Sequence, residues 1–197
     1  MKGERGMPLG TYNFDDVLLF SKKHRMIVKD RQNDEVGAII RTYDGNSSAR
    51  HNDIRKGSFY AFENNKGELL TSIAVKKKGF KSIEGYEYEL YDYKNNQIYH
   101  LQDVKWVIYL YFHMKATIQN SKFEAHEDWD EKVVLKLNKK KFAIIKFDEI
   151  TFNVEIKLLE KVNPFFMQPS FLTQIYCMYR VYSMESKVVE EIIGQIT

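Results

Sequence analysis

The feature that most constrains the fold is a short unit that recurs along the chain. In each copy an alternating segment of aromatic or β-branched residues meets a polar turn and then a second alternating segment, which is typical of a β-hairpin. Four copies span residues 26–40, 59–75, 86–101 and 133–147. The first three turns recur at intervals of roughly 30 residues, a period that suggests internal repetition. The pattern predicts a mainly β protein built from hairpins.

The turns of these units contain asparagines and Gly67, residues that tolerate the positive φ of a tight turn. A further segment, residues 151–158, alternates with Phe152, Val154, Ile156 and Leu158 on one face and polar side chains on the other. This predicts a strand with one solvent-exposed side. Roughly ten or more strands joined by short turns would leave exposed edges in one flat sheet, so we expect a closed barrel or a sandwich. Only 7 alanines against 17 isoleucines and 13 valines argue against a helical bundle.

The end of the chain has a different pattern. Ser170 follows Pro169 as a candidate N-cap, and the predicted helix, residues 170–193, is apolar or aromatic on nearly every side as far as Tyr182. Such a helix is expected to be enclosed by protein, as it would be inside a barrel. Cys177 is then a small core residue rather than a nucleophile, and Arg180 needs a buried partner. Residues 185–197 are amphipathic and could cap a barrel mouth or contact a protein partner.

We expect residues 1–10 to form an N-terminal tail and residues 11–197 a single domain. The polar tract 43–56 predicts a surface loop, and the apolar run 106–112 a buried strand. Neither a secretory signal nor an apolar stretch of about 18 residues occurs in this sequence. One cysteine excludes an intramolecular disulfide. These features favour a cytoplasmic protein, with any membrane association peripheral.

The hairpin series resembles the tubby C-terminal-like superfamily, which includes phospholipid scramblases, plant LURP-one-related proteins and bacterial tubby-like proteins. The residues that carry the likeness are 27–30, 60–67, 88–92 with Asn95 and Asn96, and the helix 171–182. The resemblance implies a closed antiparallel barrel of about twelve strands, with the C-terminal hydrophobic helix threaded through it or packed in it. It also implies a non-enzymatic module that binds anionic phospholipid surfaces. Because no phosphoinositide motif matches residue for residue, no binding residue is carried over.

Two lysine clusters are the candidate contacts for an anionic surface. The first cluster is Lys76, Lys77, Lys78 and Lys81, and the second is Lys132, Lys136, Lys139, Lys140, Lys141 and Lys146. Of the second cluster, Lys139, Lys140 and Lys141 are the candidate binding residues, together with all four lysines of the first. Clustered lysines attract anionic lipid by about 1 kcal/mol per residue, in a salt-dependent manner. The alternative interpretation is that lysines at hairpin tips maintain solubility and block edge pairing. The net charge of +3 sums strong clusters of both signs and does not identify a partner.

Other functions find less support in the sequence. A nucleic-acid site would need a coherent basic face with aromatic stacking positions, whereas the aromatics here occupy alternating core positions. No catalytic, cofactor or metal site is predicted, since the five histidines are scattered and lack ligand spacing. His113 and His126 could meet near Glu127 and Asp128 as a metal or acid–base site. More commonly, residues in such a pattern are a histidine on a strand and a solvent-exposed acidic loop, without a common site. The alternative function is a small-ligand-binding barrel, or an enzyme with a pocket in the lumen or between hairpins.

Overall fold

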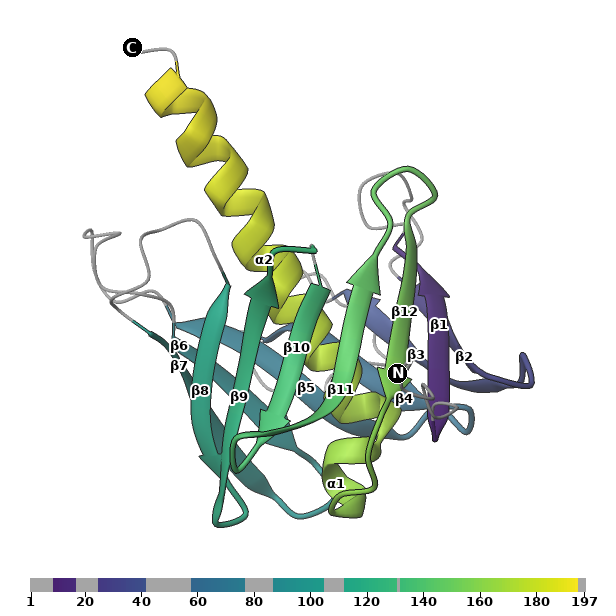
Figure 1. Cartoon of the computed structure of the whole chain (residues 1–197). Coiled ribbons are helices and arrows are strands. Elements are labelled where there is room, and N and C mark those ends of the chain that lie inside the picture. Colours follow the sequence, from purple (N-terminus) through teal and green to yellow (C-terminus); the bar gives the residue numbers. More distant parts are fainter. Residues whose placement is uncertain are drawn as a thin grey trace, which may run out of the picture.

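The strands of this protein close into one antiparallel barrel (Figure 1). The computed structural model describes residues 9–16, 25–41, 58–76, 87–104, 112–130 and 132–194, and only the backbone of residues 58, 59, 76 and 184–194. Twelve strands lie in these ranges, and each pairs with its sequence neighbours, while β1 closes the ring against β12. The strands are β1 (Gly10–Asp15), β2 (Arg25–Asp30), β3 (Glu35–Arg41), β4 (Ser58–Asn64), β5 (Leu69–Lys76), β6 (Glu87–Asp92), β7 (Gln97–Asp103), β8 (His113–Ile118), β9 (Ser121–Asp128), β10 (Lys132–Leu137), β11 (Lys140–Phe147) and β12 (Asn153–Leu158).

All four predicted hairpins are present. They are β2–β3, β4–β5, β6–β7 and β10–β11, each paired in antiparallel register. The turn residues adopt the expected left-handed conformation, with φ of 70° at Asn33, 80° at Gly67, 52° at Asn96 and 50° at Asn138. Local turn chemistry and alternation therefore specify these hairpins.

The structure differs from the sequence prediction at three places. Phe152 has a φ of 57° and lies in the turn before β12, so that strand begins at Asn153. The acidic stretch after residue 121 is a strand, β9, and not a loop, because its inward residues Phe123 and Ala125 are buried. The final helix begins at Pro169, which makes Ser170 an internal buried residue rather than the N-cap. The expected loop 43–56, most of the expected strand 106–112, and most of the N-terminal tail lie outside the described residues.

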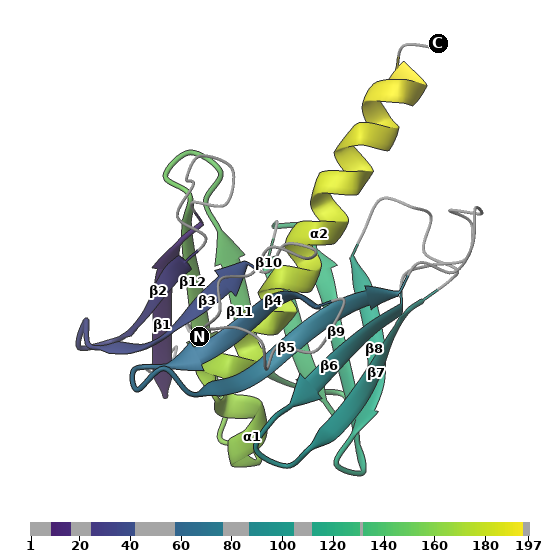
Figure 2. The same ribbon diagram turned by 180° about the vertical axis from the view of Figure 1, so that it is seen from behind.

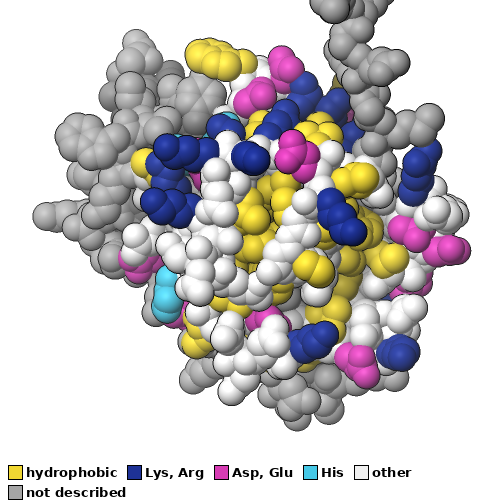
Figure 3. Space-filling view, turned by 60° about the horizontal axis from the view of Figure 1, so that its bottom comes forward, with side chains coloured by type: hydrophobic (Ala, Val, Ile, Leu, Met, Phe, Trp, Pro, Cys, Tyr) yellow, Lys and Arg dark blue, Asp and Glu magenta, His cyan; other side chains and the backbone are white. Residues whose placement is uncertain are grey.

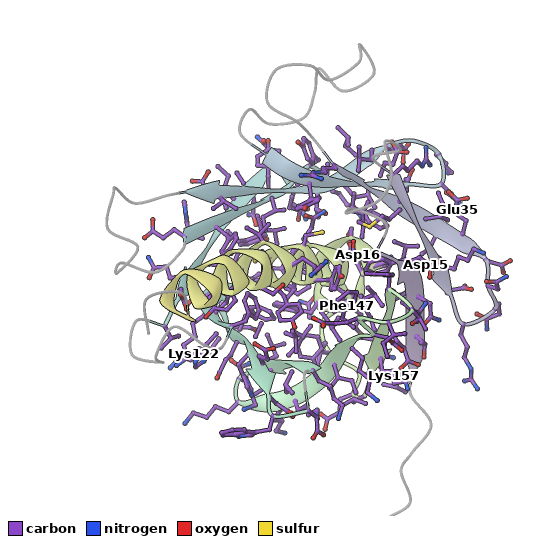
Figure 4. The ribbon with its side chains drawn as sticks, turned by 90° about the horizontal axis from the view of Figure 1, so that it is seen from above. Asp15, Asp16, Glu35, Lys122, Phe147 and Lys157 are labelled. Carbon is purple, nitrogen blue, oxygen red and sulfur yellow. The ribbon has the colours of Figure 1, made fainter. Side chains whose placement is uncertain are left out.

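Two helices follow β12, one at an end of the barrel and one in its interior (Figure 1). The short α1 (Pro164–Met167) leads into α2 (Pro169–Gly194), which runs inside the ring of strands (Figure 4). Every residue from Phe171 to Arg180 is buried, so α2 contacts protein on all sides over this length. The helix therefore fills the lumen in which the alternative function would place a small ligand. Among the described helices, none combines the length and the apolar character needed to cross a membrane.

Arg180 has the buried partner that its position demands. Its Nε donates to Oδ2 of Asp16 at 2.6 Å, and the hydroxyl of Tyr176 donates to the same oxygen at 2.6 Å. The guanidinium also lies 4.7 Å from the centre of the Phe147 ring. Figure 4 shows Asp16 and Phe147 beside the helix. Burial, followed by the Asp16 carboxylate, raises the pKa of Tyr176 far above its ordinary value, which keeps this hydroxyl protonated as a donor.

Gln174 is a buried amide that the packing does not satisfy. Its side chain is fully buried, and neither Nε2 nor Oε1 has a hydrogen-bond partner in the described part of the chain. An unpaired buried polar group costs about 1–3 kcal/mol, and methionine has a similar length without that cost. We expect Gln174→Met to raise the free energy of unfolding by about 1 kcal/mol, as measured by urea denaturation. A lower urea midpoint for the variant would show that the amide is satisfied in solution.

Candidate functional site

The outer wall of β8–β11 carries a cluster of lysines. Alternation turns Met114 and Phe123 inward, so that Lys115 on β8, Lys122 on β9 and Lys136 on β10 lie on the outside. The β8–β9 and β10–β11 turns meet at one end of the barrel, where Asn138 N donates to Lys122 O at 2.8 Å. We define the lysine face as the six lysines at this end: Lys115, Lys122, Lys136, Lys139, Lys140 and Lys141.

Strand register arranges part of this face in a row. Lys115 is paired with Glu124, Glu124 with Lys136, and Lys136 with Lys141 across four neighbouring strands. Within the described residues, no ammonium group of the lysine face lies within ion-pair distance of a carboxylate. Figure 3 brings this end of the barrel forward and shows Lys and Arg side chains gathered toward the upper left of the view. The face therefore carries positive charge that the described carboxylates do not pair.

Glu124, the carboxylate within the row, is engaged by histidines instead. Its Oε1 accepts from Nε2 of His113 at 2.9 Å and lies 3.7 Å from Nδ1 of His126. Burial alone would raise the pKa of Glu124, but the hydrogen bond from His113 and the nearby positive charges lower it below the ordinary value. Burial, and then the charge of Lys136, lower the pKa of His126. Glu124 is thus an ionised residue whose charge is directed toward the histidines.

The two histidines do meet, but not at the predicted carboxylates. His113 and His126 occupy paired positions with ring centres 5.8 Å apart, over Glu124. Glu127 is part of the inner contacts, where its Oε1 accepts from the Tyr179 hydroxyl at 3.2 Å. No group of three potential metal ligands occurs among the residues that the structure describes. The two histidines therefore gather at Glu124, and not at Glu127 and Asp128, the carboxylates of the metal or acid–base site that the sequence left open but did not favour.

The predicted lysines divide into two groups. Lys139, Lys140 and Lys141 are exposed at and after the β10–β11 turn and belong to the lysine face. Lys77, Lys78 and Lys81 lie outside the described residues. Of Lys76 only the backbone, at the end of β5, is described. Sequence reasoning missed Lys115 and Lys122. The signal that could have found them is the alternation of apolar and polar residues on both sides of the polar turn Gln119–Asn120, which is typical of a hairpin.

The predicted role of Cys177 agrees with its environment. The thiol is completely buried in α2, and this burial raises its pKa well above the ordinary value. It is a core residue of the helix.

A groove of about 700 Å³ borders the lysine face. It extends from β7 across β8 to β9, and its lining includes Lys115, Lys122 and Lys139.

Comparison with known proteins agrees with this architecture. The family model described as Tubby C-terminal like domain matches residues 12–189, which includes all strands after the start of β1 and most of α2. Neither a curated protein nor a solved structure matches the chain.

Proposed function

Since this chain belongs to the Tubby C-terminal-like domain family, we propose that it is a non-enzymatic binding module that holds anionic phospholipid surfaces against its lysine face. Membership of the family supports a binding module in general. The lysine face supports the choice of ligand, since six exposed or half-exposed lysines gather at one end of the barrel without ion-pair partners in the described chain.

The residue type fits a diffuse ligand. Lysine presents a compact charge on a flexible stem and lacks the planar fork with which arginine recognises one phosphate bidentately. A membrane surface offers many phosphates at variable positions, and each juxtamembrane lysine adds about 1 kcal/mol to the attraction. The face is therefore suited to a charged surface, and the attraction should weaken as salt shortens the Debye length from about 10 Å at 0.1 M to about 3 Å at 1 M.

Vesicle flotation tests this proposal. We expect the protein to float with vesicles of phosphatidylcholine and phosphatidylserine at low salt, and to remain in solution near 1 M salt or with phosphatidylcholine alone. Replacing Lys136, Lys140 and Lys141 by glutamine should weaken vesicle binding about a hundredfold, because about 3 kcal/mol of attraction is lost.

A matched variant controls for net charge. Lys29, Arg31 and Lys66 are exposed on the β2–β3 and β4–β5 hairpins, which lie three to six strands away from β10 and β11 around the barrel. Their replacement by glutamine lowers the net charge by the same amount as the first triple variant. It should leave vesicle binding within about threefold of the parent, because only the long-range attraction between the protein and the vesicle is weakened. Equal losses in both triple variants would mean that net charge and not the lysine face governs binding, and absent flotation at low salt would refute the proposal.

A further inference from the structure

Strands β7 and β8 pair over only part of their length. Their register contains two positions, Gln102 with Lys115 and Asp103 with Met114, and Val104 N donates to His113 O at 2.9 Å beyond them. Toward the lysine-face end the pairing stops, although β7 continues back to Gln97 and β8 on to Ile118. We call the resulting opening in the wall the seam; in Figure 2, β7 lies toward the viewer and β8 behind it.

Strand geometry determines which backbone groups face the seam. In an antiparallel pair, every second residue directs both its N–H and its C=O toward the same neighbour. The bond between Val104 and His113 therefore places the N–H and C=O groups of Ile98 and His100 on the β8 side of β7, and those of Thr117 on the β7 side of β8. The register between β7 and β8 pairs none of Ile98, His100 and Thr117 with a residue of the facing strand.

The floor of the seam is formed by the core. Tyr99 and Phe123, exposed by only 7% and 1%, line the groove from its two sides. Behind them α1 closes the barrel, with the Phe165 ring 5.4 Å from the Tyr99 ring, and Asn163 Nδ2 donating to Gln119 Oε1 at 3.2 Å. The seam is thus a groove on the surface rather than an entrance to the lumen.

The rim of the seam is basic. Lys115, Lys122 and Lys139 line one side of the groove, and His100 with an exposed side chain lies on the other. The carboxylate that shares this lining, Glu124, is hydrogen-bonded to His113. An occupant with negative side chains is therefore favoured over a basic or neutral one.

We propose that the seam is a docking site for an extended acidic segment of a partner protein, which adds as a strand to the free edge of β7. The N–H and C=O groups of Ile98 and His100 supply the backbone pairing, and the lysines select acidic side chains. The proposal is independent of lipid binding, since it requires the strand edge and not the whole lysine face.

A synthetic peptide of about ten residues that alternates glutamate and valine is a suitable probe, because it matches the length of a long strand. Its fluorescence anisotropy should rise on titration with the full chain. The same glutamate–valine peptide with every backbone nitrogen methylated carries the same charge but has no N–H group to donate to a strand edge. We expect it to bind at least about tenfold more weakly, because the unpaired backbone groups remain unpaired.

Variants at His100 separate backbone from side chain. The N–H of His100 faces the seam, so that His100→Pro removes a free donor without breaking a bond to β6. It should weaken the glutamate–valine peptide about tenfold, whereas His100→Ala should bind it within about threefold of the parent. Urea denaturation of His100→Pro should give a cooperative transition, which shows that the variant folds. Equal affinity for both peptides, or no binding by the parent, would overturn the proposal. The lysines would then serve to prevent other chains from pairing with the edge of β7.

Discussion

Ile175→Asp is expected to abolish cooperative folding. Ile175 is completely buried in the middle of the stretch from Phe171 to Arg180, in which every residue of α2 is buried. The substitution removes an apolar side chain worth about 2 kcal/mol or more of burial and places a carboxyl group where nothing can pair with it. The combined loss is comparable with the total stability of an ordinary domain, about 5–15 kcal/mol. Urea denaturation followed by tryptophan fluorescence should show no folded baseline.

Two further variants complete this test. Ile150→Asp makes the same change in the β11–β12 turn, where Ile150 is 91% exposed, and should change the free energy of unfolding by only about 0.5 kcal/mol. Ile175→Val keeps the chain foldable and should cost about 1 kcal/mol. If Ile175→Asp unfolds at the same urea concentration as the parent, α2 does not lie in the barrel.

Asp16→Ala is expected to produce the second-largest loss of stability. Asp16 is buried and receives hydrogen bonds from both Arg180 and Tyr176 on α2. Without the carboxylate, the guanidinium of Arg180 remains buried and loses its ion-pair partner, while the weaker contact with the Phe147 ring is kept. Breaking a buried ion pair in this way costs about 3–5 kcal/mol, which urea denaturation will measure as a lower midpoint.

The double variant identifies the origin of that loss. Arg180→Met removes the charge that Asp16→Ala leaves unpaired, so the double variant should be about 2 kcal/mol more stable than Asp16→Ala alone. The expected recovery reflects the removal of an uncompensated buried charge. If the two losses simply add, the ion pair does not hold the helix in the barrel.

Much of the fold could be predicted because its information is local. The alternation in β2–β3 or β10–β11 and the asparagines in their turns act within a few residues of sequence. The same is true of α2, whose apolar character on all sides requires enclosure. In contrast, β1 has a mixed composition, GTYNFD, and is held by its register with β12, which is distant in sequence. Strands of this kind are recognisable only when their partners are known.

The candidate site was less predictable because it depends on contacts between distant residues. The cluster Lys139–Lys141 is visible in the sequence, but its union with Lys115 and Lys122 follows from the register of β8, β9 and β10. Asp16 as the partner of Arg180 is separated from it by 164 positions. The seam arises from the divergence of two strands, which no pattern within either strand encodes.

Taken together, the interior of this protein is occupied by its own helix, and the chemistry available to a partner lies on the outer wall. Lysine acetylation in the presence of anionic vesicles, quantified by mass spectrometry, tests this assignment most directly. We predict that vesicles will slow the acetylation of Lys136, Lys140 and Lys141 several-fold and leave the rates at Lys29 and Lys66 nearly unchanged. Equal protection at all five lysines, or stronger protection at Lys29 and Lys66, would contradict the proposed binding face.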